Sequence, residues 1–187
     1  MVDEVKKAAE VIRSGGVLLY PTDTIWGIGC DASNPQAVER IYQIKQRSDS
    51  KSMLVLMNDL SMLEEYVERV PEQALEILKL AKKPTTIIYP EGRHLAPNLL
   101  AEDGSIGIRI TSDPFCKKLI ETTGKPIVST SANFSGEPPP DVYSKIEPGI
   151  KEAVDLVVNW KQDANNPSIP SAILRLNSNG TIKVLRP

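Results

Sequence analysis

The sequence is poor in the residues that build metal centres, disulfide frameworks and histidine-based catalytic sites. Among its 187 residues it has two cysteines and one histidine, His94. Two cysteines cannot make a disulfide framework, and without a Cys/His cluster we do not expect a structural zinc site. A Ser-His-Asp triad could use only His94, for which a solvated loop position is the simpler interpretation. These counts favour a reducing, cytoplasmic setting.

Several signatures of membrane and nucleotide-binding proteins are also missing. No apolar run approaches the roughly 20 residues that a membrane helix needs, and residues 1–4 do not begin a signal peptide. There is no Gly-Lys-Ser/Thr phosphate loop and no Gly-x-Gly-x-x-Gly after a predicted strand. The net charge of −2 provides no general basic field for nucleic acid. We therefore expect no membrane association, and any anion site must be local.

Apolar periodicity and turn signals divide the chain into alternating strands and helices. Val5, Ala8 and Ile12 recur at helical spacing before Gly15-Gly16, which predicts a first helix and its end. Further helices are expected to begin at Asn34-Pro35, Pro71 and Asp113-Pro114. Apolar runs predict strands at 17–20, 53–57, 85–89, 106–110, 126–129, 156–159, 172–176 and 181–185. The pattern predicts one domain over residues 1–187 with an α/β (α+β-like) fold, a twisted mixed sheet with flanking helices.

The segment from Ser129 to Gly136 is rich in uncharged polar side chains. It follows the apolar run 126–128, so it is predicted to leave a buried strand. In extended chain Ser129, Ser131 and Asn133 would point to one side and offer hydrogen-bond donors and acceptors along one surface. Such a row suits a polar ligand, although a Ser/Asn-rich turn ended by Gly136 would have the same composition.

The segment from Tyr20 to Trp26 also leaves a predicted strand. If it stays extended, Thr22 and Thr24 share one face and Asp23 lies opposite. This pattern predicts a small polar pocket walled by Tyr20 and Trp26. A purely structural strand-to-loop turn is the competing interpretation.

Three cations fall within seven residues between a predicted helix and a predicted strand: Lys45, Arg47 and Lys51. Cations near a helix C-terminus are favoured by the helix dipole, so a solvated charge run is one interpretation. The other is that they converge on a polyphosphate, for which Arg supplies a planar fork and Lys a point charge.

Arg109 lies inside the predicted strand 106–110, where period two places it on one face with Ser105 and Gly107. A buried arginine needs an anionic partner, which could be a structural Asp or Glu or the carboxylate of a ligand. Ser171, after Pro170, and the terminal Arg186 are weak signals by themselves, for which a turn and a surface cation suffice.

Five motifs follow one another along the chain. They are Tyr20-Pro-Thr-Asp-Thr with Gly27 and Gly29, Lys45-x-Arg47-x-x-x-Lys51, Gly107-x-Arg109, Ser129-Thr-Ser-Ala-Asn133-x-Ser-Gly136, and Pro170-Ser171. In this order they resemble the YrdC/TsaC family, the L-threonylcarbamoyladenylate synthases of the tRNA t6A pathway. The resemblance runs from about residue 8 to the C-terminus and fits the short, single-domain form. It implies the YrdC-like fold, with a positively charged concave face.

The resemblance also implies an enzyme, a nucleotidyltransferase that converts L-threonine, bicarbonate or CO2, and ATP into threonylcarbamoyl-AMP and pyrophosphate. It assigns threonine contacts to Thr24, Arg109, Ser129 and Ser171, and ATP contacts to Arg47, Lys51, Ser105, Ser131, Asn133 and Arg186. Lys45, Arg47 and Lys51 would carry the catalysis by neutralising charge on the phosphates, with Mg²⁺ accompanying ATP. Further expected partners are tRNA or double-stranded RNA and other t6A-pathway proteins. An RNA-binding paralogue without synthase activity is the alternative.

Three positions depart from the family pattern. Ser52 stands where the family usually has proline after the last lysine, Lys82-Lys83-Pro84 stands in place of Pro-Gly-Pro, and Ala172 replaces threonine after Pro170-Ser171. These departures affect the expected loop geometry near the phosphates rather than the resemblance itself.

Overall fold

The fold alternates strands and helices, as the sequence predicts. The computed structural model describes residues 1–46, 53–164, 170–177 and 181–187. Its helices are α1 (Val2–Arg13), α2 (Pro35–Ile44), α3 (Leu63–Tyr66), α4 (Glu72–Leu80), α5 (Pro114–Thr123) and α6 (Pro148–Ala153), with 3-10 turns η1 (Leu60–Met62), η2 (Pro97–Leu99) and η3 (Tyr143–Lys145). Its strands are β1 (Leu18–Tyr20), β2 (Gly27–Gly29), β3 (Leu54–Met57), β4 (Thr85–Tyr89), β5 (Ile106–Ile110), β6 (Ile127–Ser131), β7 (Leu156–Val157), β8 (Ala172–Leu176) and β9 (Ile182–Arg186).

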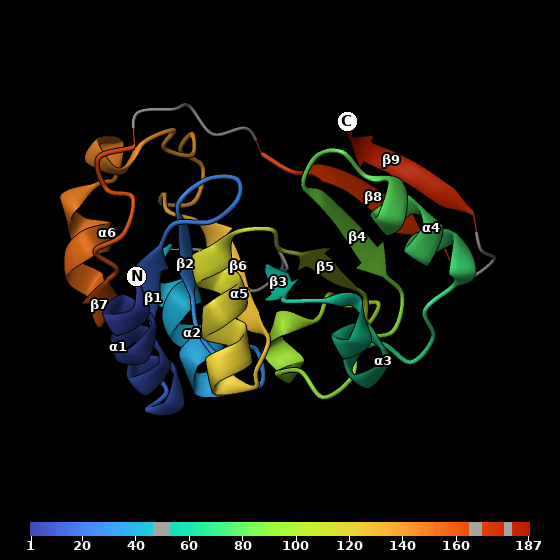
Figure 1. Ribbon diagram of the computed structural model, residues 1–187, viewed down its shortest axis with the longest axis horizontal. Coiled ribbons are helices and arrows are strands. Elements are labelled where there is room, and N and C mark those ends of the chain that lie inside the picture. The colour runs from blue at the N-terminus through green and yellow to red at the C-terminus, as the bar shows by residue number, and fades with distance from the viewer. Residues whose placement is uncertain (47–52, 165–169, 178–180) are drawn as a thin grey trace.

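The described strands form one nine-stranded sheet in the order β7-β1-β2-β6-β3-β5-β4-β8-β9. Neighbours β1/β7, β3/β5 and β4/β8 are parallel, and the other pairs are antiparallel. The prediction of a mixed sheet flanked by helices is therefore confirmed. Figure 1 shows the two ends of this sheet, with β7, β1 and β2 near α1 and α2, and β4, β8 and β9 near α4. No helix in the described part of the chain is long and apolar enough to cross a membrane.

Local capping chemistry explains the helix starts. The side chain of Asn34 accepts hydrogen bonds from the first turn of α2, and that of Asp113 does the same for α5. Proline then occupies the first helical position of both helices. The sequence did not reveal β2, because two of its three residues are glycine. Gly29 is required there, since a Cβ on it would lie 2.1 Å from the carbonyl oxygen of Val128.

Helices cover both faces of the sheet in its first half. Because side chains alternate along a strand, Leu56 and Ile127 pack under α1 and α5, whereas Val55 and Val128 pack on the opposite face with residues of α2. The buried cluster under α1 and α5 includes no residue of β5, β4 or β8. On those strands, the same face of the sheet borders a cavity.

Candidate functional site: a cavity on the open half of the sheet

Two rows of directly paired residues cross the sheet and form the floor of the cavity. One row runs Ser129–Leu54–Gly107–Ile88, and the other runs Arg109–Thr86–Ile173–Arg186. Residues paired directly across strands point to the same face. The register of six strands therefore brings together side chains that are more than 100 positions apart in the sequence.

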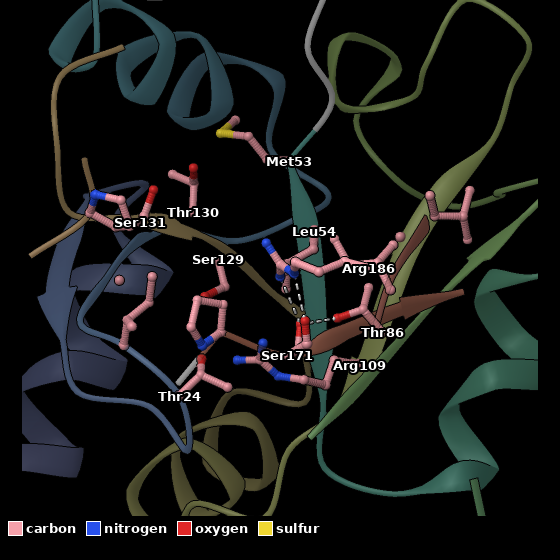
Figure 2. A pocket seen from close by; sticks show the side chains of 17 residues that line it. Thr24, Met53, Leu54, Thr86, Arg109, Ser129, Thr130, Ser131, Ser171 and Arg186 are labelled. Carbon is pink, nitrogen blue, oxygen red and sulfur yellow. Dashed lines mark hydrogen bonds between the residues drawn. The ribbon is translucent and has the colours of Figure 1, made fainter. Parts of the chain in front are cut away.

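The cavity has a volume of about 290 Å³. Its polar lining consists of Thr24, Thr86, Arg109, Ser129, Thr130, Ser131, Ser171 and Arg186. Its apolar lining includes Ile25, Met53, Leu54, Ile88, Pro139, Pro170 and Ile173. Figure 2 shows hydroxyls from the β2 and β6 side facing Arg109, Arg186, Thr86 and Ser171 across the cavity. A chamber with several hydroxyls and two guanidinium groups suits a small, polar, anionic ligand.

Arg109 is buried, and its anionic partner is Asp23: their Nη2 and Oδ1 atoms lie 3.1 Å apart. The contact is an ion pair by distance rather than an aligned hydrogen bond, because Asp23 Oδ1 accepts none. The other carboxylate oxygen accepts from the backbone N–H of Ser112 at 3.0 Å. Arg109 nevertheless lines the cavity, and its Nε–H has no partner in the described structure. A structural carboxylate thus orients the guanidinium and leaves it a donor for a ligand.

Arg186 contributes the second guanidinium from β9, the edge strand. Its Nε donates to the carbonyl oxygen of Ser171 at 2.8 Å, and the Ser171 hydroxyl lies 2.9 Å from that of Thr86 (Figure 2). None of the ion pairs found among the described residues involves Arg186. Burial and the neighbouring Arg109 guanidinium both lower the pKa of Arg186. Within the described part of the chain, the cavity therefore holds a cation without an acidic counterpart, which favours an anion.

The loop after β1 is bent, so the extended conformation on which the interpretation of the sequence depended does not occur. The Thr22 hydroxyl donates to the carbonyl of Ile25 at 2.8 Å and lies 3.0 Å from the Thr24 hydroxyl. The prediction that Tyr20 and Trp26 wall the pocket was also wrong, since neither lines it. The wall is Ile25.

The polar side chains at the end of β6 line the cavity only as far as Ser131. Ser129, Thr130 and Ser131 line the cavity, but Asn133 does not. The Asn133 amide instead donates to the carbonyl oxygens of Phe134 and Glu137 at 2.9 and 2.8 Å. Its side chain thus holds the loop that follows β6.

Lys45 holds the same loop from the end of α2. Its ammonium group is buried and donates to the carbonyl oxygens of Ser131 and Asn133 at 2.5 and 2.6 Å. Its own carbonyl accepts from the N–H of Ser135 at 2.9 Å. Both of these ammonium contacts are to protein backbone. The phosphate contact expected from the sequence stays a prediction.

The remaining predicted residues separate into two groups. Arg47, Lys51 and the departure at Ser52 lie outside the described residues. Ser105 is described and does not line the cavity, and its hydroxyl donates to Asp103 at 2.5 Å. The structure therefore brings together Thr24, Arg109, Ser129, Ser131, Ser171 and Arg186.

Sequence reasoning missed Thr86, Asp23 as the partner of Arg109, and the floor residue Leu54. Thr86 and Leu54 lie on correctly predicted strands, but only the register shows which residues they oppose. For Asp23 a signal existed, since a buried arginine requires an anion. An extended segment, however, would place Asp23 on the face opposite Thr22 and Thr24, away from the predicted pocket.

A family model for Sua5, YciO and YrdC proteins, described as "Telomere recombination", matches residues 10–187. The chain belongs to the Sua5/YciO/YrdC family. Among relatives of this family, the threonylcarbamoyl-AMP synthase of Stenotrophomonas maltophilia is 36% identical over 156 residues, which cover 81% of this chain and 83% of that protein. The Photobacterium profundum protein of the same name is 31% identical over 160 residues and covers 84% of this chain and 86% of that protein.

Solved Sua5/YciO/YrdC structures share the fold. Escherichia coli YciO has a TM-score of 0.85 at 28% identity, covering all of this chain and 89% of that one. The P. abyssi Sua5 structure complexed with L-threonine has a TM-score of 0.82 at 24% identity. It is similar over 98% of this chain, which spans 53% of the P. abyssi chain.

Proposed function

We propose that this protein is a threonylcarbamoyl-AMP synthase. It would convert L-threonine, bicarbonate and ATP into threonylcarbamoyl-AMP and pyrophosphate. The observation that carries the proposal is the cavity itself. Hydroxyl groups from β4, from β6, from the loop after β1 and from the residue before β8 line it together with two guanidinium groups. The name shared by the curated relatives supports the same activity. ATP and L-threonine are thus the expected substrates.

The threonine end of the site is built around Arg109. Its unpartnered Nε–H, and a guanidinium oriented by Asp23, suit the threonine carboxylate. Thr24 and Ser129 line the facing wall, and Ser171 lines the side next to Thr86. These neutral hydroxyls match the hydroxyl and amine of a small amino acid.

The ATP end is proposed to begin at Ser131 and Arg186 and to extend toward Arg47 and Lys51. Ser131 and Arg186 line the cavity, and Arg186 has a positive charge that no described acid balances. The contacts of Ser105 and Asn133 favour a structural role for both side chains. Lys45 is proposed to position Ser131 through its bond to the Ser131 carbonyl.

The proposed chemistry requires positioning and charge stabilisation. The threonine amine attacks the carbon of CO2 derived from bicarbonate and loses a proton, which gives a carbamate. A carbamate oxygen then attacks the α-phosphorus of ATP, and the bond to the β,γ-pyrophosphate breaks. Fixed cations stabilise the charge that develops on the phosphates, and holding the reactants together lowers the entropic barrier.

Mg²⁺ is proposed as part of the ATP substrate. The described residues contain no group of three or more His, Cys, Asp and Glu side chains that could hold a metal ion. These residues therefore do not fit a resident metal centre. Participation of tRNA and of other t6A-pathway proteins stays a prediction.

The test measures pyrophosphate release from ATP with L-threonine and bicarbonate each omitted in turn. We expect release only when both are present. L-Valine, which has the shape of threonine without its hydroxyl, is the matched control and should support much slower turnover, because buried hydroxyls would lose their partner. Release that needs neither threonine nor bicarbonate, or none from folded protein, would contradict the proposal.

A further inference from the structure

Gly107 occupies the middle of the cavity floor without a conformational reason to be glycine. It lies within β5, a strand with neighbours on both sides, and it is not among the described glycines with positive φ. Glycine inside a strand is unfavourable, because it loses more conformational entropy on folding than other residues and adds no side-chain packing. A compensating benefit is therefore expected.

Packing does not require glycine at this position either. A Cβ on Gly107 would lie 3.4 Å from Thr86 Cγ2, 3.6 Å from Leu54 Cβ and 3.9 Å from Ile88 Cγ1, which are ordinary contact distances. Gly29 is the opposite case, because a Cβ there would lie 2.1 Å from a backbone oxygen. The fold needs Gly29, whereas it can accept a methyl group at Gly107.

The space above Gly107 belongs to the cavity and is bordered by carbon atoms. Gly107 lines the cavity and is half-buried. The three heavy atoms nearest to a new Cβ are methyl or methylene carbons. Arg109 is two residues further along the same strand and face, about 6.6 Å away at the usual rise per residue. An amino acid with its carboxylate on Arg109 would therefore have its side chain near this carbon-lined space.

We propose that Gly107 determines the substrate specificity of the synthase, by leaving room for the side-chain methyl group of L-threonine. This inference rests on the proposed function and adds a residue that contacts the part of the substrate distinguishing threonine from serine. The neighbouring hydroxyls recognise the polar atoms, and the carbon-lined space above Gly107 receives the methyl group.

The test replaces Gly107 with alanine and compares turnover of L-threonine and L-serine. A one-carbon change in a pocket alters selectivity by about 10- to 200-fold. We expect kcat/KM for threonine to fall within that range, kcat/KM for serine to fall much less, and KM for ATP to stay the same. The melting temperature should equal or exceed that of the unmodified protein. Gly149→Ala is the matched control: its Cβ meets Phe134 Cζ at 3.4 Å and lies outside the cavity.

A second variant separates a clash with the substrate from crowding within the protein. Thr86→Ser removes the methyl group nearest to the new Cβ and keeps the hydroxyl that meets Ser171. In Gly107→Ala/Thr86→Ser, threonine selectivity should stay low. Restored selectivity would overturn the proposal, as would unfolding of Gly107→Ala, unchanged selectivity, or an effect on ATP alone. No threonine-dependent turnover by the unmodified protein would instead contradict the proposed function.

Discussion

Leu54 and Leu56 are two residues apart on β3 and point to the same face of the sheet, yet they lie in different surroundings. Leu56 is fully buried under α1 and α5, together with Phe115 and Ile127. Leu54 is half-buried and lines the cavity beside Gly107. Leu54 also packs against that buried cluster, so it lies where the covered part of the sheet meets the cavity. The comparison shows how one continuous sheet has a covered half for stability and an open half for a ligand.

The charged residues of the two halves differ in the same way. In the covered half, the partly exposed Arg40 and Asp155 form an ion pair at 2.7 Å. In the open half, Arg109 and Asp23 form a buried pair, and Arg186 has no acidic partner among the described residues. Surface pairs contribute little to stability, whereas a buried charge left alone is costly. Removing either partner of the buried Arg109–Asp23 pair at the cavity should therefore lower the free energy of unfolding.

Arg109→Ala should have the largest effect, because it removes the ligand donor and leaves Asp23 buried without its cation. We expect a loss of about 3–5 kcal/mol in the free energy of unfolding. Threonine affinity should fall more than ATP affinity in the protein that remains folded. Denaturant unfolding and calorimetric titration with each substrate measure these effects, and Arg40→Ala is the surface control. Equal loss of both affinities would point to a purely structural arginine.

Leu56→Ala and Leu54→Ala test the boundary between the two halves directly. Leu56→Ala should cost about 2–5 kcal/mol of unfolding free energy, since it opens a cavity in a packed core. Leu54→Ala should cost clearly less and change KM for threonine instead. Thermal unfolding and steady-state kinetics on both variants make the measurement. Similar stability losses would show that the open half is as tightly packed as the covered half.

Lys45→Met should leave the Ser131 and Asn133 carbonyl oxygens without their ammonium donor. Each unsatisfied buried group costs about 1–3 kcal/mol, so the melting temperature should fall. If Lys45 positions Ser131, kcat should fall with little change in KM for ATP, and the salt dependence of ATP binding should persist. Lys118→Met, which removes an exposed cation, is the control. A large rise in KM for ATP would indicate direct phosphate contact.

Asp155→Asn should have the smallest effect. The hydrogen bond from Arg40, followed by that from the Val17 N–H, lowers the pKa of Asp155 in the folded protein. A carboxylate with a lowered folded-state pKa stabilises the fold above its unfolded pKa, and this contribution is lost as the pH falls through the folded-state pKa. The variant should be slightly less stable at pH 7, and the difference should shrink under acidic conditions. Urea unfolding at several pH values measures it, and a pH-independent difference would contradict the assignment.

The sequence by itself determined the features that depend on neighbouring residues. Asn34-Pro35 and Asp113-Pro114 begin helices because their side chains cap the first turn locally, and apolar runs bounded by turn residues form β3, β4, β5 and β8. The ordered motifs were sufficient to indicate the family. Composition likewise indicated that no histidine-based or zinc-based site was to be expected.

Only the tertiary structure decided which residues meet. Strand order and register arise from packing between distant segments, so the pairs Thr86–Arg109 and Leu54–Gly107 cannot be read from local patterns. The same applies to Asp23, which lies in the bent loop after β1 and pairs with Arg109. It applies also to Lys45, whose ammonium group donates to the carbonyl oxygen of Ser131, 86 residues away. A side chain's role in this cavity depends on the partner opposite it, and long-range contacts alone determine that partner.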